Sequence, residues 1–316
     1  MQNKYVVFIK KYNISSNKLT AIEQDASSRK YFKIKNNKNF LLMDSPPAEN
    51  NNDRFITISK HLNKINLSAP KIITCNKDKS LILIENFGDN TFNKALNNKI
   101  SEFKLYRRAV DALLEIHKND FPKGIPVYSK DILMNEVNLF IEWYCNYKNI
   151  NLSLSSKNKW NSIWNKYLEP LTKSNNKLVL RDFHVDNLFW LESRKNIKKV
   201  GIIDFQDALI GNIEYDLSSL LEDVRKDISD KTKNDVFEYF ISNSNIDNIN
   251  KFKLNYKILT AQRNAKIAGI FVRLAERDKK TRYLSMVNKA ILIFKKSAKD
   301  ANLLELLNWH EDNSVN

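Results

Sequence analysis

The sequence predicts an α+β fold of two lobes, a small β-rich lobe over residues 1–88 and a larger, mainly helical lobe over residues 89–316. Three observations support this division. Short apolar runs bounded by polar turns fill much of the first 88 residues, a pattern typical of strands. Beyond residue 100, apolar residues recur every three or four positions, which predicts amphipathic helices. Three short apolar runs between residues 178 and 203 predict a ribbon inside the helical lobe.

The small lobe is expected to hold a sheet and one helix. Residues 1–17 predict an opening helix or an irregular segment, and strands are predicted over residues 18–23, 31–35, 40–43, 71–74 and 81–85. Phe55, Ile58 and Leu62 have helical spacing, so residues 52–62 predict the helix. The last strand, LILIE, runs into a turn, and we place the lobe boundary near Gly88.

The large lobe is expected to consist mostly of helices. They are predicted over residues 101–118, 131–147, 160–171, 236–241, 252–274 and 283–307. The tract ALIGNIEYDLSSLLEDVR, which begins at Ala208, is expected to enter a further helix with Asp216 at its start. A carboxylate there is favourable with the helix dipole. His117 lies on an apolar helix face and is expected to pack rather than to catalyse.

Composition excludes several classes of protein. No stretch approaches the roughly 20 apolar residues of a membrane span, and no signal peptide is expected at residues 1–10. Cys75 and Cys145 are the only cysteines, which argues against a disulfide framework or a cysteine metal site and favours a cytoplasmic location. The net charge of +16 comes from scattered lysines, so we expect a solvated surface and no nucleic-acid or membrane partner.

The stretch LVLRDFHVDNLFWLESRKNIKKVGIIDFQD, residues 178–207, carries the chemistry. Asp182, Asn187 and Asp204 follow the order of a kinase catalytic loop, in which an Asp accepts the acceptor's hydroxyl proton, and an Asn and a later Asp hold magnesium. Magnesium prefers oxygen ligands and keeps several waters. The competing interpretation is that these are ordinary turn residues between strands. The ordered set D-x4-N, strand, turn, strand, D-F favours phosphoryl transfer with ATP and Mg²⁺.

RDFHVDNLFWL and GIIDFQDALIGNIEYDLSSLLEDVR resemble the aminoglycoside-phosphotransferase superfamily, which shares the protein-kinase-like fold. Within it, DFQDA and YDLxSLLxDxR are most similar to bacterial kinases that phosphorylate N-acetylmuramate and N-acetylglucosamine at the anomeric hydroxyl in cell-wall recycling. The resemblance implies that Asp216 braces the catalytic loop backbone. Many relatives have a His two residues before the catalytic Asp, where this chain has Leu180.

The resemblance also implies where the nucleotide binds. QDASSRKY lies where a kinase places its phosphate-covering loop, but it lacks glycine, so Ser27, Ser28 and Arg29 are the candidates there. The third strand lacks the usual phosphate-pairing lysine, and Arg29, Lys30 and Lys33 stay open as substitutes, with Glu49 or Asp53 as the acidic partner of that cation. The hinge residues Glu85 and Phe87 are expected to contact adenine.

For the acceptor, the resemblance points to the helix of residues 131–147 and to TAQRNAKIAGIFVRLAERDKKTRYL. Glu136 and Trp143 are candidates on the first; Arg263, Lys266 and Arg273 share one face of the second and suit a neutral or anionic acceptor. A solvated or ion-paired face is the competing interpretation. The implied product is a sugar 1-phosphate, which gives a functional link to a sugar-1-phosphate nucleotidyltransferase.

Two other functions stay open at this point. One is an aminoglycoside or choline-type phosphotransferase, whose cationic acceptor would require an acidic pocket. The other is a basic pseudokinase that binds RNA or a protein. The missing glycines and third-strand lysine favour the pseudokinase, whereas Asp182, Asn187 and Asp204 oppose it. The sequence leaves the oligomeric state undecided.

Overall fold

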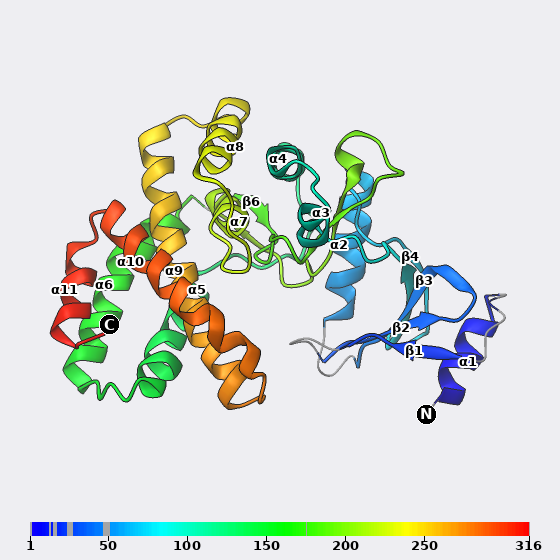
Figure 1. Ribbon diagram of the computed structural model, residues 1–316, viewed down its shortest axis with the longest axis horizontal. Coiled ribbons are helices and arrows are strands. Elements are labelled where there is room, and N and C mark those ends of the chain that lie inside the picture. Colours follow the sequence, from blue (N-terminus) through cyan, green and yellow to red (C-terminus); the bar gives the residue numbers. More distant parts are fainter. Residues whose placement is uncertain are drawn as a thin grey trace. The chain divides into compact units, whose positions relative to one another are not determined.

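The computed structural model describes residues 2–12, 14, 18–23, 28–46, 51–174 and 176–315 (Figure 1). By packing, the chain divides into two compact units. The first comprises Met1–Ile125 and Val185–Ala208, and the second comprises Pro126–His184 and Leu209–Asn316. The predicted lobe boundary near Gly88 lies inside the first unit, at a turn where Gly88 has a φ of 80°. That boundary stays a prediction.

The first unit contains a five-stranded antiparallel sheet with the order β1-β2-β3-β5-β4. Its strands are β1 (Leu19–Ala21), β2 (Lys30–Ile34), β3 (Asn37–Asp44), β4 (Ile72–Cys75) and β5 (Leu81–Glu85). The sheet therefore contains all five strands predicted for the small lobe. Asn36, with a φ of 64°, forms the turn between β2 and β3, a conformation that Asn tolerates well.

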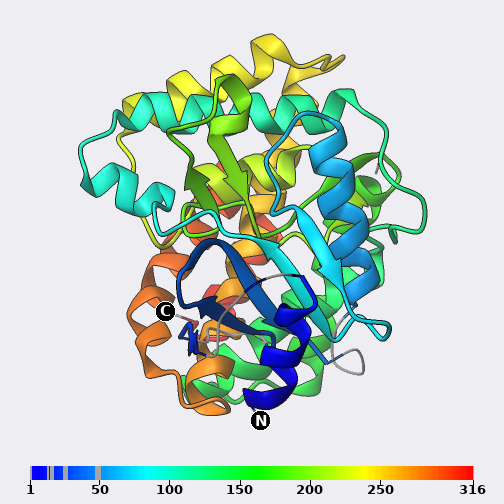
Figure 2. The same ribbon diagram turned by 90° about the vertical axis from the view of Figure 1, so that its right-hand side faces the viewer.

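Different helices pack against the sheet at different places. Helix α1 (Gln2–Lys10) lies against one face, where Tyr5, Phe8 and Ile9 pack on Leu42 and Leu83 (Figure 2). Side chains alternate along a strand, so Leu41 and Ile84 point to the opposite face. Helix α2 (Asn52–Lys64) buries Phe55, Ile58 and Leu62, the three residues whose spacing predicted it, and packs against β4.

The first unit is completed by short helices and a ribbon. Its remaining elements are α3 (Phe92–Asn97), α4 (Glu102–Lys118), β7 (Leu188–Trp190), the 3-10 helix η2 (Asn196–Lys199) and β8 (Val200–Ile202). β7 and β8 pair antiparallel, and bridges from Ser68 to Gly201 and from Thr91 to Phe189 attach this ribbon to the rest of the unit. A ribbon was predicted here from three apolar runs, but inside the helical lobe; two of the runs form β7 and β8 in the first unit, and the other forms β6 (Lys177–Val179), which pairs with β9 (Leu209–Gly211). Helix α3, which is capped by the Thr91 side chain, was not predicted.

The second unit is helical apart from one pair of strands. Its elements are α5 (Lys130–Leu139), the π-helix η1 (Phe140–Cys145), α6 (Leu154–Thr172), β6 (Lys177–Val179), β9 (Leu209–Gly211), α7 (Glu214–Leu221), α8 (Asp230–Asn243), α9 (Ile249–Glu276), the 3-10 helix η3 (Thr281–Met286), α10 (Val287–Asp300) and α11 (Leu304–Asp312). Helix α9 is central and packs against α5, η1, α7, η3 and α10 (Figure 1). Stacked aromatic rings, including Phe140, Trp160 and Phe294, fill the core beside it.

Two predictions about this unit are wrong in detail. The helix predicted over residues 283–307 ends at Asp300, because Asn302 adopts a φ of 55° and α11 begins only at Leu304. Residues 209–211 form β9, which pairs with β6 and was not predicted, and the predicted helix then begins at Glu214 with Asp216 in its first turn, as expected. The helix predicted over residues 131–147 changes to a π-helix at Phe140, close to the point where Gly269 of α9 approaches the backbone of Leu139.

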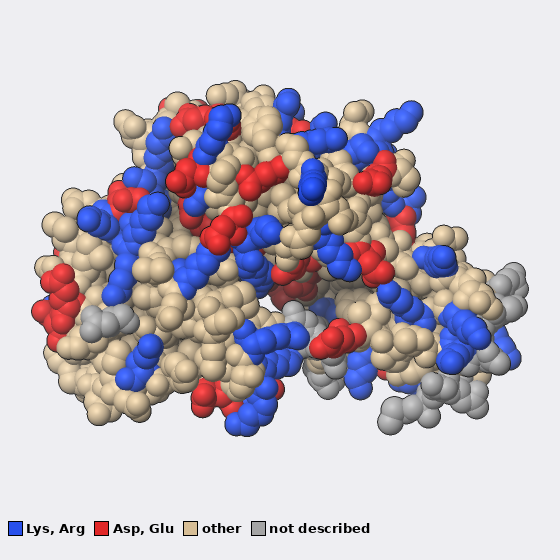
Figure 3. Space-filling view, viewed as in Figure 1, with Lys and Arg blue, Asp and Glu red and all other residues tan. Residues whose placement is uncertain are grey.

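Among the described residues, the distribution of charged side chains and the hydropathy of the helices are those that the sequence predicts. Lys and Arg side chains are dispersed between Asp, Glu and neutral residues on the face shown in Figure 3. No helix in the described part of the chain combines the length and apolarity that crossing a bilayer requires.

Candidate active site

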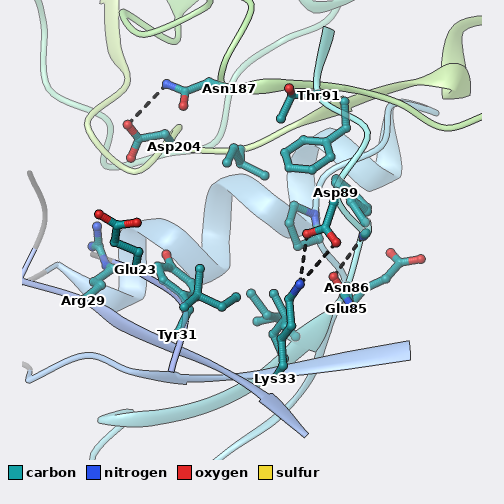
Figure 4. A pocket seen from close by; sticks show the side chains of 18 of the residues that line it. Glu23, Arg29, Tyr31, Lys33, Glu85, Asn86, Asp89, Thr91, Asn187 and Asp204 are labelled. Atoms are coloured by element: carbon teal, nitrogen blue, oxygen red, sulfur yellow. Dashed lines mark hydrogen bonds and ion pairs between the residues drawn. The ribbon is translucent and has the colours of Figure 1, made fainter. Parts of the chain in front are cut away.

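A cavity of about 400 Å³ lies in the first unit (Figure 4). Leu41 and Ile84 of the sheet, Phe55 of α2 and Phe189 and Ile203 of the ribbon supply its apolar walls. Polar side chains lie at its two ends: Glu85, Asn86 and Asp89 follow β5 at one end, and Asn187 and Asp204 flank the ribbon at the other. An apolar slot with polar ends is the form expected of a cofactor or nucleotide site.

The segment after β5 is held rigidly. Asn86 N–H donates to the carbonyl of Asn39 at 2.8 Å, and Gly88 N–H donates to the Asn86 side-chain oxygen at 2.9 Å. The Glu85 carboxylate accepts from the Arg194 guanidinium, which also lies 5.2 Å from the ring centre of Phe87. The two predicted hinge residues therefore lie together at the pocket wall, in a fixed backbone conformation.

The other end of the pocket brings the two predicted metal ligands together. Asn187 Nδ2 donates to Asp204 Oδ2 at 3.4 Å, and Gln206 Nε2 donates to Asp204 Oδ1 at 2.8 Å (Figure 4). Pairing of β7 with β8 causes this proximity, because Asn187 directly precedes β7 and Asp204 follows β8. Asp204 has a φ of 60°, in the left-handed region, which Asp adopts more readily than most residues.

As metal ligands, Asn187 can offer its carboxamide oxygen and Asp204 its carboxylate oxygens. Among the residues that the structure describes, no group of three or more His, Cys, Asp or Glu side chains is placed to hold a metal ion. Such a pair suits a hard cation that keeps waters and takes further oxygen ligands from a substrate, as magnesium does with phosphates. It does not suit zinc, which takes nitrogen or sulfur ligands in most sites.

Two of the candidate cations line the pocket at different places (Figure 4). Arg29 is 5% exposed, and its guanidinium lies 5.9 Å from the Phe55 ring centre. We call the end of the pocket with Asn187 and Asp204 the metal end, and Figure 4 shows Arg29 and Tyr31 on the same side of the pocket as Asp204. Burial raises the pKa of Tyr31 to about 12, with Arg29 lowering and Asp204 raising it. Lys33 Nζ instead forms an ion pair with Asp89, at 3.1 and 3.2 Å from its two carboxylate oxygens.

The remaining residues predicted to bind the nucleotide, or to pair with its cation, are not among the described residues that line the pocket. Ser28 and Lys30 are exposed. Ser27 and Glu49 lie outside the described residues. Asp53, the other acidic candidate, pairs with the exposed Lys79.

In the second unit, a loop after β6 carries Asp182. The backbone amides of Leu180 and Arg181 donate to the two oxygens of Asp216, at 2.6 and 2.8 Å. This is the bracing role that the resemblance implied. Burial raises the pKa of Asp216 to about 7, against the lowering effect of these amides. His184 is buried, and burial together with Arg225 and Arg263 lowers its pKa well below the usual value, so it is neutral in the loop.

The acceptor candidates of this unit have several different environments. The buried Glu136 accepts from Lys266 Nζ at 2.8 Å and from the Arg181 guanidinium. Arg263 is also buried and donates to Ser219 Oγ at 2.8 Å. Of the three cations predicted to share one face, Arg263 and Lys266 are therefore buried with partners on other helices, and Lys266 is ion-paired as the competing interpretation had it.

Trp143 and Arg273 are the two acceptor candidates that retain partial exposure. Trp143 packs against the aromatic core of the second unit. Burial lowers the pKa of Arg273, with a further contribution from Arg277.

The sequence reasoning missed three residues that the structure places in these sites. Asp89 follows the turn at Gly88 and pairs with Lys33. In the sequence it is marked only by being an acidic residue directly after the predicted hinge. Arg181 and Tyr128 contact Glu136. Arg181 directly precedes Asp182, the predicted catalytic residue, so its position in the sequence was a usable signal. Tyr128 lies 54 positions from Asp182, and nothing in the sequence pointed to it.

A sequence model of the family described as phosphotransferase enzyme family, APH, matches residues 18–245. The chain belongs to this family. It is therefore a phosphotransferase, and the predicted enzyme class, with an alcohol group as acceptor, is confirmed. Family membership further implies a nucleotide as phosphoryl donor.

Curated relatives extend over most of this chain. It is 27% identical over 325 aligned residues to the N-acetylmuramate/N-acetylglucosamine kinase of Caulobacter vibrioides, covering 91% of this chain and 89% of that protein. It is 28% identical over 278 residues to the N-acetylmuramate/N-acetylglucosamine kinase of Neisseria meningitidis serogroup B, covering 84% and 81%. The predicted resemblance is thereby confirmed.

Solved structures confirm the predicted two-lobed, protein-kinase-like fold. The ADP-bound aminoglycoside phosphotransferase APH(2'')-Ib superposes with a TM-score of 0.63 at 16% identity, covering 93% of this chain and 98% of that one. A choline/ethanolamine kinase family protein from Mesorhizobium loti superposes with a TM-score of 0.65 at 11% identity, covering 96% and 97%. At these identities the likeness concerns the fold alone.

Proposed function

We propose that this phosphotransferase is an ATP-dependent sugar kinase that phosphorylates the anomeric hydroxyl of N-acetylmuramate or N-acetylglucosamine. The observation that carries the kinase chemistry is the pocket of the first unit, with a rigid hinge at one end and the paired Asn187 and Asp204 at the other. The acceptor is proposed from the curated relatives, which bear this activity in their names over most of the chain. The product, a sugar 1-phosphate, would serve a nucleotidyltransferase, in the cytoplasm.

The adenine of ATP would lie between the apolar walls of the pocket. Leu41 and Ile84 flank it from the sheet, and Phe189 and Ile203 flank it from the ribbon. The hinge at Glu85 and Phe87 offers backbone polar groups for the edge of the base. Because the Glu85 side chain is engaged by Arg194, the base would be recognised by backbone rather than by this carboxylate.

The phosphates would lie at the metal end. Asn187 and Asp204 would hold Mg²⁺, which neutralises phosphate charge when bound. Arg29 would act as the phosphate-pairing cation that the third strand lacks, because it lines the metal end, whereas Lys33 pairs with Asp89 at the hinge end. Ser28, which directly precedes Arg29, would cover the phosphates.

Asp182 would accept the proton of the acceptor hydroxyl or orient that hydroxyl for in-line attack. Its loop is anchored by Asp216, so positioning would supply most of the rate enhancement. On the acceptor side, Trp143 and Arg273 keep partial exposure and are the better candidates for direct contact. The buried Arg263 and Lys266 would act as fixed positive charge behind the site, which favours a neutral or anionic acceptor over a cationic one.

The test is an ATP-consumption assay with N-acetylmuramate, N-acetylglucosamine, glucose, choline and an aminoglycoside, followed by phosphorus NMR of the product. We expect an anomeric phosphate on an N-acetyl sugar. Turnover with choline or the aminoglycoside alone would overturn the proposed acceptor but keep the chemistry. Binding of ATP without turnover of any acceptor would overturn the proposed reaction and favour a pseudokinase.

Two substitutions separate the proposed roles of the acidic residues. Asp182→Ala is expected to lower kcat by about a hundredfold to ten-thousandfold, because it removes the proton acceptor, with ATP affinity kept. Asp204→Ala is expected to weaken magnesium-dependent ATP binding as well, which calorimetry with and without Mg²⁺ measures. Asp186→Asn, in the same loop but bonded to Asn93, is the matched control and should retain activity. Wild-type turnover by Asp182→Ala would show that the catalytic loop has been assigned wrongly.

A further inference from the structure

The residue before Asp182 has an unusual backbone conformation. Arg181 has a φ of 73°, in the left-handed region that L-residues other than Gly, Asn and Asp rarely adopt. Such strain persists only where the surrounding structure over-determines it. Because Asp182 follows directly, the φ of Arg181 sets the direction in which the chain presents Asp182.

Two carboxylates restrain Arg181, one through its backbone and one through its side chain. Asp216 accepts the amides of Leu180 and Arg181. Glu136, from α5, accepts the Arg181 guanidinium, which also lies 5.5 Å from the ring centre of Tyr128. The backbone contact and the side-chain contact come from different helices, so together they leave this residue little freedom.

Glu136 is itself held from several sides. Its Oε1 accepts from Lys266 Nζ at 2.8 Å and from Arg181, and its Oε2 accepts from the Tyr128 hydroxyl and from Gln262 Nε2 at 3.3 Å. Burial alone would raise the pKa of Glu136, but Lys266 and Arg181 outweigh it and lower the pKa to about 2. The carboxylate is therefore charged at any working pH, and both oxygens already have protein donors.

We propose that Glu136 is a positioning residue, which holds the Arg181 guanidinium and thereby fixes the strained backbone that orients Asp182. The proposal rests on the catalytic role proposed for Asp182. It replaces direct contact of Glu136 with the acceptor, because an acceptor hydroxyl would have to displace one of the four protein donors that Glu136 already has. Lys266 and Gln262, both on α9, then serve to keep the carboxylate in place.

The first test is Glu136→Gln, which keeps the shape and removes the charge. We expect kcat to fall by about tenfold to a hundredfold, because Asp182 loses its orientation. The KM for ATP should stay within about twofold, because the described residues that line the nucleotide pocket all belong to the other unit. Glu169→Gln, which removes an exposed carboxylate paired with Lys130, is the matched control and should leave kcat unchanged.

The kinetic pattern distinguishes this role from substrate binding and from simple stability. A raised KM for the acceptor with an unchanged kcat would mean that Glu136 binds the acceptor, and it would overturn the proposal. Equal kcat in wild type and Glu136→Gln would also overturn it. The rate is normalised to ATP-binding sites, so loss of folded protein does not count as loss of kcat.

A second pair of variants tests the backbone argument and is independent of the folding of Glu136→Gln. Arg181→Gly and Arg181→Ala both remove the guanidinium, but only glycine adopts a φ of 73° without strain. We expect Arg181→Gly to retain at least about fivefold more kcat than Arg181→Ala. Adding Glu136→Gln to Arg181→Ala should cost little more, because the two residues act through one contact. Equal kcat for the two single variants would overturn the proposal.

Failure of the proposed function remains distinguishable. If wild type transfers phosphate to no acceptor, the proposed function fails, and amide hydrogen exchange still tests the inference. The amides of Leu180 and Arg181 should lose protection in Glu136→Gln relative to Glu169→Gln. Unchanged protection of those amides would overturn the positioning role whatever the substrate is.

Discussion

The pocket of the first unit, proposed to bind the nucleotide, and the ion network around Glu136 in the second unit contain charged pairs of opposite exposure. In the pocket, the Lys33 and Asp89 side chains pair while 49% and 66% exposed. In the network, the Lys266 and Glu136 side chains pair while only 11% and 9% exposed. An exposed pair contributes about 0–1 kcal/mol and exchanges readily with water. Breaking a buried pair leaves an uncompensated charge and costs about 3–5 kcal/mol.

This difference indicates how the work of the enzyme is divided. A binding pocket must release its own contacts when a ligand enters, and weak, solvated pairs allow that. A catalytic loop must keep one conformation through every turnover, and a buried network in which both Glu136 oxygens accept hydrogen bonds favours that. The same residue types thus have different roles, and their burial decides which.

From this difference we expect the second unit to tolerate added side-chain volume less well than the first. Gly201 in the first unit and Gly269 in the second test this, because a Cβ added at either would meet neighbouring atoms. Gly269→Ala would place a methyl group against the backbone carbonyl of Leu139, so we expect a loss of about 2–3 kcal/mol in the free energy of unfolding. Gly201→Ala would meet the Phe87 ring at 2.8 Å, and this ring lines the pocket and can shift.

Urea denaturation of both alanine variants measures the difference. For Gly201→Ala we expect a loss of about 1 kcal/mol or less, together with a raised KM for ATP because Phe87 moves. A larger stability loss at Gly201 than at Gly269 would contradict the comparison.

The next prediction separates the two pocket cations. Arg29→Ala should weaken ATP binding about 30-fold, or about 2 kcal/mol, with adenosine affinity unchanged, because the guanidinium is expected to pair with phosphates. Lys33→Ala should weaken both ligands by about threefold or less, since its pair with Asp89 is exposed. Isothermal titration calorimetry with ATP and adenosine measures this.

Lys30→Ala, at the residue next to Arg29 on the exposed side of β2, is the control for general loss of positive charge and should bind like wild type. If Lys33→Ala weakened ATP more than Arg29→Ala did, the phosphates would lie towards the hinge and the direction of the nucleotide would have to be reversed.

The smallest expected effect concerns pH. His310 is buried among Phe140, Trp160 and Phe294, and burial lowers its pKa from 6.5 to about 3. The unfolded chain therefore takes up a proton on acidification that the folded chain does not. The contribution of neutral His310 to the free energy of unfolding is therefore fully present above pH 6.5 and is lost as the pH falls towards 3. The loss is about 1 kcal/mol between pH 6.5 and 5.5.

His310→Phe should remove this loss, and the measurement is the difference in unfolding free energy from wild type at each pH. Subtracting the wild-type value is needed because Asp216, with its pKa raised to about 7, stabilises the fold as the pH falls and does so in both proteins. His61, half-buried on α2 of the first unit, has its pKa lowered by burial and Lys64, and His61→Asn should change the pH slope less. An identical pH slope in wild type and His310→Phe would refute the prediction.

Much of the fold and of the chemistry followed from the sequence, because both depend on local patterns. Phe55, Ile58 and Leu62 have helical spacing, and the apolar runs of β3 and β5 involve only neighbouring residues. Asp182, Asn187 and Asp204 stand in fixed order around short apolar runs. Strand pairing of β7 with β8 then brings Asn187 to Asp204, as the order of the motif predicted.

Other features depended on contacts between residues far apart in the chain, and only the tertiary structure decided them. Arg29, Lys30 and Lys33 are equivalent cations in sequence, and the pleat of β2 with the position of Asp89 distinguishes them. Glu136 looked like an acceptor ligand because its helix was assigned to the acceptor side. Its partners Arg181 and Lys266 lie 45 and 130 positions away, so its burial and full hydrogen bonding could not be read from periodicity.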